Sequence, residues 1–487
     1  MNPTQIFILL IAYFGLLFVI SYITGKSDSN EAFFKANSNS PWYLVAFGMV
    51  GASLSGVTFI SVPGWVGQTS FTYLQVVIGY FFGYLVVAYI LLPIYYKLRL
   101  PSIYSYLSER FNPSTQKVGA FYFLISRVIG ASFRLYLVAL VLHTYLFEPL
   151  GVPLEATVIL SVGLIYAYTF RGGIRTIVIT DSLQTFLMLL SVGLSIYLIL
   201  DELNFSVSQY LSSTSFESMS QVWVTEDFGR SDFFLKSLIG GMFITISMTG
   251  LDQDMMQKNL SCKNLKEAQK NMLVFSTVLV IVTTLFIFLG ALLYSYAEVM
   301  GIGIPTQNGV TRTDLLFPEI ALKGNLGILV SISFFLGLIA AAYSSADSAL
   351  TSLTTSICFD FLDLANDNSR ATIQKRKWIH LGVAILLILV IIAFSYWVDQ
   401  NVIDSLLTVA GYTYGPLLGL FAFGLFTSHQ IKGNRVFPIT IASVILITLT
   451  ANLPSDFLGN YKLGYELLPL NGTITFSLLY LFRSRTS

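Results

Sequence analysis

Charged residues are scarce in this sequence. Lys, Arg, Asp and Glu together make up 11% of its 487 residues, whereas soluble globular proteins average about 25%. Hydrophobic residues reach 55%, and the mean hydropathy is +0.72. This composition excludes a single soluble domain and indicates a chain that crosses a lipid bilayer several times.

Cysteine and histidine are also rare. The two cysteines, Cys262 and Cys358, are too few for a disulfide framework, and we expect both to be reduced. The three histidines, His143, His380 and His429, are scattered along the chain without metal-ligand spacing. No G-x-S-x-G or H-E-x-x-H motif occurs, so we expect no enzyme activity. A net charge of +1 without a basic tract argues against a nucleic acid partner.

Apolar runs of about 20 residues, the length that spans the hydrocarbon core, recur along the chain. We expect the first run to be a retained helix, because no A-x-A-like cleavage site follows it. The thirteen predicted segments are 5–24, 42–66, 71–96, 118–147, 153–170, 177–201, 233–258, 270–298, 326–360, 378–397, 402–427, 434–452 and 466–483.

Lysine and arginine are divided unevenly between alternate connections of these segments. Twenty of the 27 fall in one set of connections and five in the other. Basic connections stay in the cytoplasm. We therefore expect an outside N-terminus, a cytoplasmic C-terminus and a multi-pass protein of the plasma membrane, which in a bacterium is the inner membrane.

Glycine, proline and hydroxyl residues interrupt two of the apolar segments. GMVGASLSGVTFISVPGWVG runs from Gly48 to Gly67, and GGMFITISMTGLDQ runs from Gly240 to Gln253. Such residues at membrane depth favour broken helices with free carbonyl groups, although close helix packing produces the same composition. The two segments are five apart, and they therefore predict two blocks of five helices, as in inverted-repeat transporters.

The stretch AAAYSSADSALTSL, residues 340–353, places small and hydroxyl residues inside an apolar segment. Ala341, Ser344, Ser345 and Ser348 are spaced i, i+3, i+4 and i+7, so one helix face carries three hydroxyl groups and little bulk. Small residues let another backbone approach closely, and hydroxyl oxygens are hard ligands for a small cation. The pattern predicts a cation site between two helices.

Four charged residues, Arg127, Arg134, Asp181 and Asp347, lie inside predicted apolar segments, where charge is costly and marks function. The two arginines are seven apart and share a helix face. Either one can bind a carboxylate of a solute, while Arg127 can instead pair with an acid such as Asp252. Asp181 and Asp347 can coordinate or relay a cation, or pair with a nearby base, and the sequence leaves these roles open.

Four stretches together resemble the sodium/solute symporter family. The resemblance covers essentially the whole chain, in both order and spacing. The stretches are GLDQDMMQKNLSCKNLKEAQKNML at 250–273, RGGIRTIVITDSLQ at 171–184, AAAYSSADSALTSL at 340–353 and GYTYGPLLGLFAFGLF at 411–426.

The resemblance implies an all-α polytopic membrane protein with about 13 transmembrane helices and the LeuT-type fold. One transporter domain, 1–487, would contain inverted five-helix repeats at 42–201 and 233–427. A flanking helix at 5–24 and two C-terminal helices at 434–483 would complete it. The implied partners are sodium ions, a small organic solute and the lipid bilayer, with no obligatory protein partner.

The same resemblance assigns residues to the ions and the solute. Met248 stands where sugar-transporting relatives carry an aromatic gate, and the hydroxyl groups at the first break resemble the sialic-acid branch. The implied sodium ligands are Gly51, Leu54, Ala341, Ser344 and Ser345. A second sodium, present in some members, would use Asp181, Asp347 and Ser348, although Asp347 replaces a hydroxyl residue there. The implied solute-binding residues are Ser53, Ser55, Thr58, Gln75, Arg134, Arg127 and Thr245.

We therefore expect a symporter that couples sodium entry to import of a small anionic solute, such as a sialic acid, another sugar acid or a carboxylate, by alternating access. The alternatives are a neutral sugar, an amino acid or a vitamin-like solute, and proton coupling with Asp181 and Asp347 as relays. A membrane-embedded sensor on the same scaffold would need a signalling domain, which we do not expect.

Overall fold

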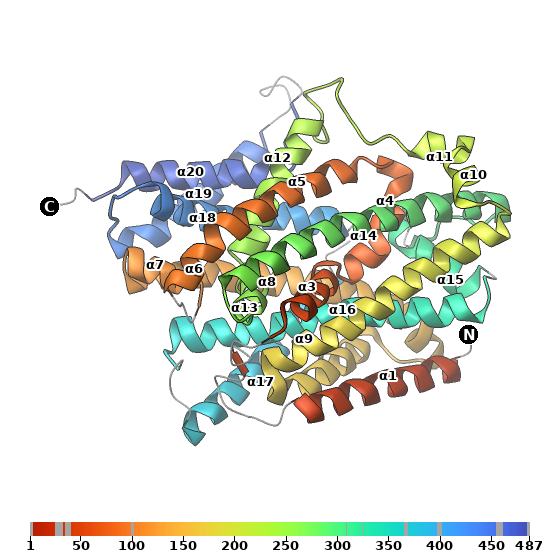
Figure 1. Ribbon diagram of the computed structural model, residues 1–487, viewed down its shortest axis with the longest axis horizontal. Coiled ribbons are helices and arrows are strands. Elements are labelled where there is room, and N and C mark those ends of the chain that lie inside the picture. The colour runs from red at the N-terminus through yellow and green to blue at the C-terminus, as the bar shows by residue number, and fades with distance from the viewer. Residues whose placement is uncertain are drawn as a thin grey trace.

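Helices make up nearly all of this computed structural model (Figure 1). Within the described residues, strands are confined to the antiparallel pair β1 (Thr306–Gln307) and β2 (Val310–Thr311). The structure describes residues 3–24, 33–34, 40–98, 102–307, 309–324, 326–364, 369–396, 402–453 and 461–484.

Helices dominate because a backbone in lipid must satisfy its hydrogen bonds internally. The first half contains α1 (Pro3–Thr24), α3 (Trp42–Ser53), α4 (Gly56–Thr69), α5 (Tyr73–Val86), η2 (Val87–Leu91), α6 (Leu92–Leu98), α7 (Ser105–Arg110), α8 (Pro113–Leu142), η3 (His143–Phe147), η4 (Glu148–Leu150), α9 (Leu154–Glu202), α10 (Val207–Leu211) and α11 (Thr214–Met219). The second half contains α12 (Phe234–Thr245), η5 (Ile246–Gly250), α13 (Gln253–Leu260), α14 (Leu265–Met300), η6 (Thr313–Leu315), α15 (Leu316–Lys323), α16 (Ile328–Ser356), η7 (Ile357–Phe361), α17 (Arg370–Ser395), α18 (Val402–Phe426), α19 (Gly433–Ala451) and α20 (Leu467–Leu481).

Polar caps fix the start of three long helices. Asn112 accepts a hydrogen bond from the third backbone N–H of α8, and Asn264 and Ser369 do the same for α14 and α17. These caps satisfy backbone donors that a helix end otherwise leaves free. Figure 1 shows α1 beginning at one end of the molecule and α20 ending at the other.

Both predicted helix interruptions are present. The axis bends by 56° between α3 and α4, and by 64° between the helix ending at Gly250 and α13. A third irregularity lies in α9, where Gly173 has a positive φ of 52° and separates the predicted segments 153–170 and 177–201. An added Cβ at Gly173 would overlap the backbone of Phe33, so the kink also permits a close approach.

The number of membrane crossings is bounded by helix length and composition. Among the described residues nine helices can cross a membrane, or up to eleven if each bent pair counts as one span. The shorter apolar helices Leu154–Phe170 and Leu467–Leu481 coincide with two further predicted segments. The count of thirteen, the repeat boundaries and the sidedness stay predictions. Four of the basic residues counted for the sidedness lie outside the described residues, namely Lys26, Lys35, Arg99 and Arg485.

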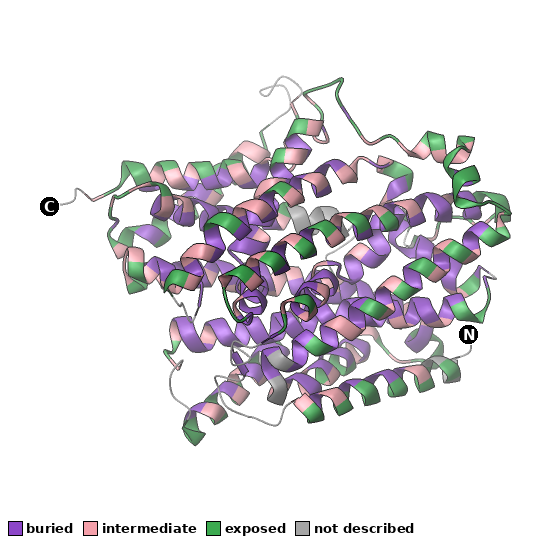
Figure 2. Ribbon diagram, in the orientation of Figure 1, coloured by how far each residue is buried: buried purple, intermediate pink, exposed green. Residues whose placement is uncertain are grey.

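Helix α16 is the centre of the bundle. Every residue from Gly337 to Ser356 is buried, and the helix packs against α4, α8, α9 and α17. Figure 2 shows this helix crossing the middle of the molecule in the colour of buried residues, while α1 and α20 expose one face. The predicted cation stretch, 340–353, therefore lies in the interior.

Helices α5 and α12 pack backbone to backbone through glycine. A Cβ at Gly241 would overlap the carbonyl oxygen of Val76, and a Cβ at Gly79 would overlap that of Leu238. Because backbone cannot move aside as a flexible side chain does, Gly241→Val is expected to lower the yield of folded, monodisperse protein severalfold. The control Gly15→Val, whose Cβ meets nothing within 4 Å, should leave the yield unchanged. Equal yields on size-exclusion chromatography would contradict this packing.

Candidate functional site

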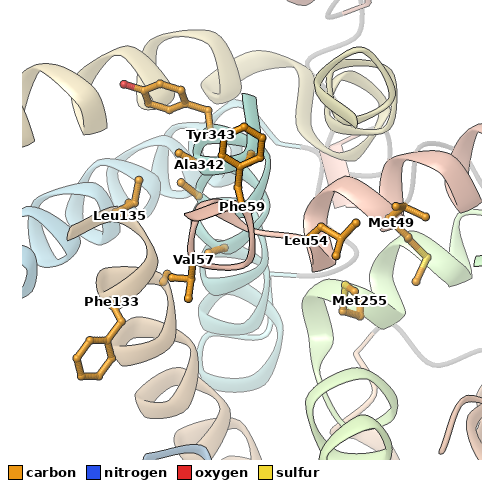
Figure 3. Close-up of a cluster of buried hydrophobic side chains, with 14 of the residues drawn as sticks. Met49, Leu54, Val57, Phe59, Phe133, Leu135, Met255, Ala342 and Tyr343 are labelled. Atoms are coloured by element: carbon orange, nitrogen blue, oxygen red, sulfur yellow. The ribbon is translucent and has the colours of Figure 1, made fainter. Parts of the chain in front are cut away.

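The site is organised by the break between α3 and α4. Leu54 has non-helical backbone angles (φ −82°, ψ 71°), so the last carbonyl groups of α3 have no helical partner. The break lies directly against α16, because an added Cβ at Gly56 would be 3.7 Å from the backbone of Ala342. Figure 3 shows Val57 on the side of α8 and Leu54 on the side of α13, with Ala342 above them in this view.

Hydroxyl groups of α16 reach this break. Ser345 Oγ donates to the carbonyl oxygen of Ala52 at 3.2 Å, and Ser344 Oγ donates to Asp181 Oδ1 at 2.6 Å. Ala341 lies one turn earlier on the same helix and is buried. The Ser345 contact brings the predicted ligands of α16 against the first break, and the Ser344 contact brings them against Asp181 of α9. The carbonyl that Ser345 contacts is that of Ala52, one residue after Gly51.

Asp181 has a partner that the sequence did not predict. Lys258 Nζ lies 2.8 Å from Asp181 Oδ2, and both side chains are almost completely buried. Lys258 belongs to α13, the short helix that follows the second break. The side chain of Arg175, a nearby base in the sequence, lies outside the described side chains.

Asp347 and Ser348 lie beside this ion pair. Asp347 Oδ2 accepts a hydrogen bond from Tyr168 Oη at 2.8 Å, and its electrostatic neighbours include Asp181 and Lys258. Asp347 Oδ1 and Ser348 Oγ are buried without a hydrogen-bond partner among the described residues. The surroundings of the Ser344 hydroxyl are therefore rich in oxygen atoms.

A cavity of about 120 Å³ lies beside the break. Arg134 faces it and has no ion pair or hydrogen bond to any described residue. Met248 also contributes to the lining. Six predicted solute-binding residues line this cavity, namely Ser53, Ser55, Thr58, Arg127, Arg134 and Thr245.

The two arginines of α8 differ in their partners. Arg127 pairs with Asp254, and its Nη1 lies 3.9 Å from Asp252 Oδ2. Asp252 in turn accepts a hydrogen bond from Tyr414 Oη at 2.6 Å and caps α13. Of the alternatives for Arg127, the structure therefore supports pairing with acids of the second broken segment. Arg134 remains as the cavity's free guanidinium among the described residues.

The model of the "Sodium:solute symporter family" matches residues 33–433. The chain belongs to this family. Its transport activity is therefore sodium-coupled symport, and the resemblance inferred from the sequence motifs is confirmed.

Curated relatives of the symporter include two bacterial proteins. The sodium/sialic acid symporter SiaT of Proteus mirabilis is 22% identical over 95% of this chain and 92% of the relative. The sodium/sialic acid symporter NanT of Aliivibrio fischeri is 25% identical over 93% of this chain and 89% of the relative. A solved Na⁺-coupled sialic acid symporter in a substrate-bound outward-open state superposes with a TM-score of 0.81 at 19% identity, covering 97% of this chain and 96% of that one. This similarity shows the LeuT-type fold predicted from the sequence.

Gln75 is not among the residues that line the symporter's cavity, although we predicted it as a solute ligand. Its Nε2 donates to the carbonyl oxygens of Thr72 and Asp232, at 3.1 and 3.2 Å. Its Oε1 accepts from the backbone N–H of Val224 at 3.2 Å. These bonds use both ends of the buried amide, so the structure gives Gln75 the role of anchoring the 220–233 connection.

A vestibule of about 610 Å³ adjoins the small cavity, and Tyr73 and Ile244 line both. Residues 230–232 of the long connection form part of the vestibule wall. There Arg230 donates two hydrogen bonds to Asp232, which lower the pKa of that carboxyl group. The symporter is therefore hollowed on the side of this connection.

The opposite side of the cavity is closed by polar contacts. Tyr104 Oη donates to the carbonyl oxygen of Leu251 at 2.9 Å, and the backbone N–H of Ile103 donates to Gln253 Oε1 at 3.0 Å. The buried pair of Arg127 with Asp254 lies at the same level of the second break. Among the described residues, the vestibule thus lies on one side of the cavity and these polar contacts lie on the other.

Proposed function

We propose that the symporter couples sodium entry to import of a small organic anion that carries a carboxylate, such as a sialic acid. The observation that carries this proposal is Arg134, a guanidinium that faces a cavity beside the cation site and has no ion pair with any described residue. A planar guanidinium binds a carboxylate through two parallel hydrogen bonds. The sialic acid solutes named for two relatives, SiaT and NanT, support the same class. We assign no catalytic residue.

In this proposal sodium binds where α16 meets the first break. Its ligands would be the hydroxyl groups of Ser344 and Ser345 and the carbonyl groups of Gly51, Leu54 and Ala341. The Ser345 hydroxyl already bonds a carbonyl of the break, which supports this choice. Sodium prefers several oxygen ligands, and this site offers them from two separate helices, which the ion would tie together.

The vestibule side would be the outside of the cell, in agreement with the charge of the connections and an outside N-terminus. Sodium and solute would enter through the vestibule, and rocking of the two five-helix repeats would then open the opposite side. Each sodium ion moving inward through the membrane potential contributes about 2.3 kcal/mol per 100 mV. In a bacterium the symporter would reside in the inner membrane.

The test is uptake into vesicles reconstituted with purified symporter. We expect an inward sodium gradient to drive accumulation of labelled sialic acid or another carboxylate from a panel that includes a neutral sugar and an amino acid. A potassium gradient or a proton gradient alone should drive none. Uptake of only neutral solutes, or uptake that is independent of sodium, would contradict the proposal.

Asp252→Asn is expected to loosen the closed side. Asparagine still caps α13, but it no longer carries the charge that lies opposite Arg127. With Cys262 and Cys358 replaced, a cysteine introduced at Ser53 reports access to the cavity. In inside-out vesicles an impermeant thiol reagent should label this cysteine severalfold faster in Asp252→Asn than in the protein that retains Asp252.

The matched control is Asp232→Asn, which removes an acid on the vestibule side. This variant should leave labelling from the inner side unchanged, because Asp232 pairs with Arg230, far from the closed side. Equal labelling rates in Asp252→Asn and the unmodified protein would show that the Asp252 charge does not hold the inner side closed.

A further inference from the structure

Asp181 has both carboxylate oxygens occupied by groups of the protein. Oδ1 accepts a hydrogen bond from Ser344 Oγ at 2.6 Å, and Oδ2 lies 2.8 Å from Lys258 Nζ. The side chains of Asp181 and Lys258 are 0% and 1% exposed. Separating such a buried pair costs several kilocalories per mole, because each charge is then left unpaired in a medium of low polarity. The ammonium group is thus a permanent neighbour of the cation site.

Helix α13 delivers this ammonium group to the site. Asp254 and Lys258 are four residues apart, so they share one face of the helix. Asp254 pairs with Arg127 beside the solute cavity, while Lys258 pairs with Asp181 beside Ser344. The short helix after the second break therefore carries fixed charges from the solute cavity to the cation site.

The ammonium group of Lys258 already neutralises the carboxylate of Asp181. The two oxygens of that carboxylate are in contact with Lys258 Nζ and Ser344 Oγ, so neither is left for another ion. A second sodium at Asp181 would have to displace an ammonium group that is attached to the protein and cannot diffuse away.

We propose that Lys258 is a built-in counter-ion that takes the place of a second transported cation at Asp181, so that the symporter binds one sodium ion. Lys258 is thus a residue that determines the stoichiometry of coupling. This inference rests on the proposed function only in taking sodium as the ion of the site formed by Ser344 and Ser345, and it does not depend on the solute.

The experiment counts sodium ions. Equilibrium binding of ²²Na⁺ to the purified full-length symporter at pH 8 should show one saturable site. Lys258→Met should show two sites, because the freed Asp181 carboxylate can then hold an ion. Lys258→Arg, and the control Lys323→Met at an exposed position on α15, should each retain one. Two sites in the unmodified protein, or one site in Lys258→Met, would overturn the inference.

A second variant keeps the test decisive if Lys258→Met does not fold. Asp181→Asn combined with Lys258→Met removes the whole pair and leaves no unpaired buried charge. This double variant should still bind one sodium ion. Loss of that ion would show that Asp181 itself is a sodium ligand and would overturn the inference.

The count of sodium sites tests the role of Lys258 separately from the uptake experiment, which tests the proposed function. Two sodium sites together with sodium-driven uptake of a carboxylate would reject only the role of Lys258. One sodium site together with uptake of only neutral solutes would reject only the proposed solute class.

Discussion

Replacing Ser344 and Ser345 together by alanine is expected to abolish sodium-dependent uptake. The two hydroxyl groups are the oxygen atoms of α16 that reach the first break and Asp181. Interactions of a neutral group with a charge contribute about 1.5–3 kcal/mol each, so the loss of two should weaken sodium binding by about 100-fold or more. The measurement is the initial rate of solute uptake as a function of sodium concentration.

Ser352→Ala is the matched control, because the Ser352 hydroxyl is buried in the same helix but, among the described residues, bonds only to the carbonyl oxygen of Ala349. It should leave the sodium dependence unchanged. Folding of the double variant is checked by size-exclusion chromatography, and alanine favours the helix at both positions. A double variant that folds and responds to sodium as the unmodified protein does would reject the assigned site.

Arg134→Ala is expected to cause the largest loss in solute recognition. The guanidinium of Arg134 faces the cavity without a partner among the described residues, so it is available to a carboxylate. Losing a charge-assisted hydrogen-bonding partner of about 1.5–3 kcal/mol should raise KM for an anionic solute by about 10- to 100-fold. Arg134→Lys keeps the charge but cannot form two parallel hydrogen bonds to a carboxylate. Its KM should therefore lie between those of the unmodified protein and Arg134→Ala.

Sodium binding provides the internal control for Arg134→Ala, because Arg134 is not among the assigned sodium ligands. The count of bound ²²Na⁺ should therefore be preserved while uptake falls. Arg435→Ala removes an exposed arginine far from the cavity and should change neither quantity. Undiminished uptake of carboxylates by Arg134→Ala would remove the basis for an anionic solute.

Local sequence patterns predicted the framework of the site. Glycine, proline and hydroxyl residues mark places where a membrane helix can break, and the structure has both expected breaks. The periodicity of residues 340–353 placed Ser344 and Ser345 on one face, and that face meets the first break. These features depend on spacing along one segment, which the sequence displays directly.

Partners from distant segments could not be predicted in the same way. Arg127 and Arg134 share a helix face and look alike in the sequence. In the structure Arg127 differs by pairing with Asp254, which comes from the second broken segment. Gln75 is a polar residue in an apolar run, but its hydrogen bonds to the 220–233 connection appear only in three dimensions. Lys258 ends the predicted segment 233–258 and resembles a residue at a membrane surface, because the sequence does not show that the short helix α13 buries it after the second break.

The most direct test of sodium coupling follows two fluxes in the same vesicles. Labelled sialic acid and ²²Na⁺ are added outside vesicles whose membrane contains the symporter. No other ion gradient is applied across that membrane. We predict that each flux requires the other ion or solute, in a fixed ratio, and that Ser344→Ala with Ser345→Ala loses both coupled fluxes. Entry of the acid at an unchanged rate without sodium, or with no accompanying sodium flux, would contradict the account.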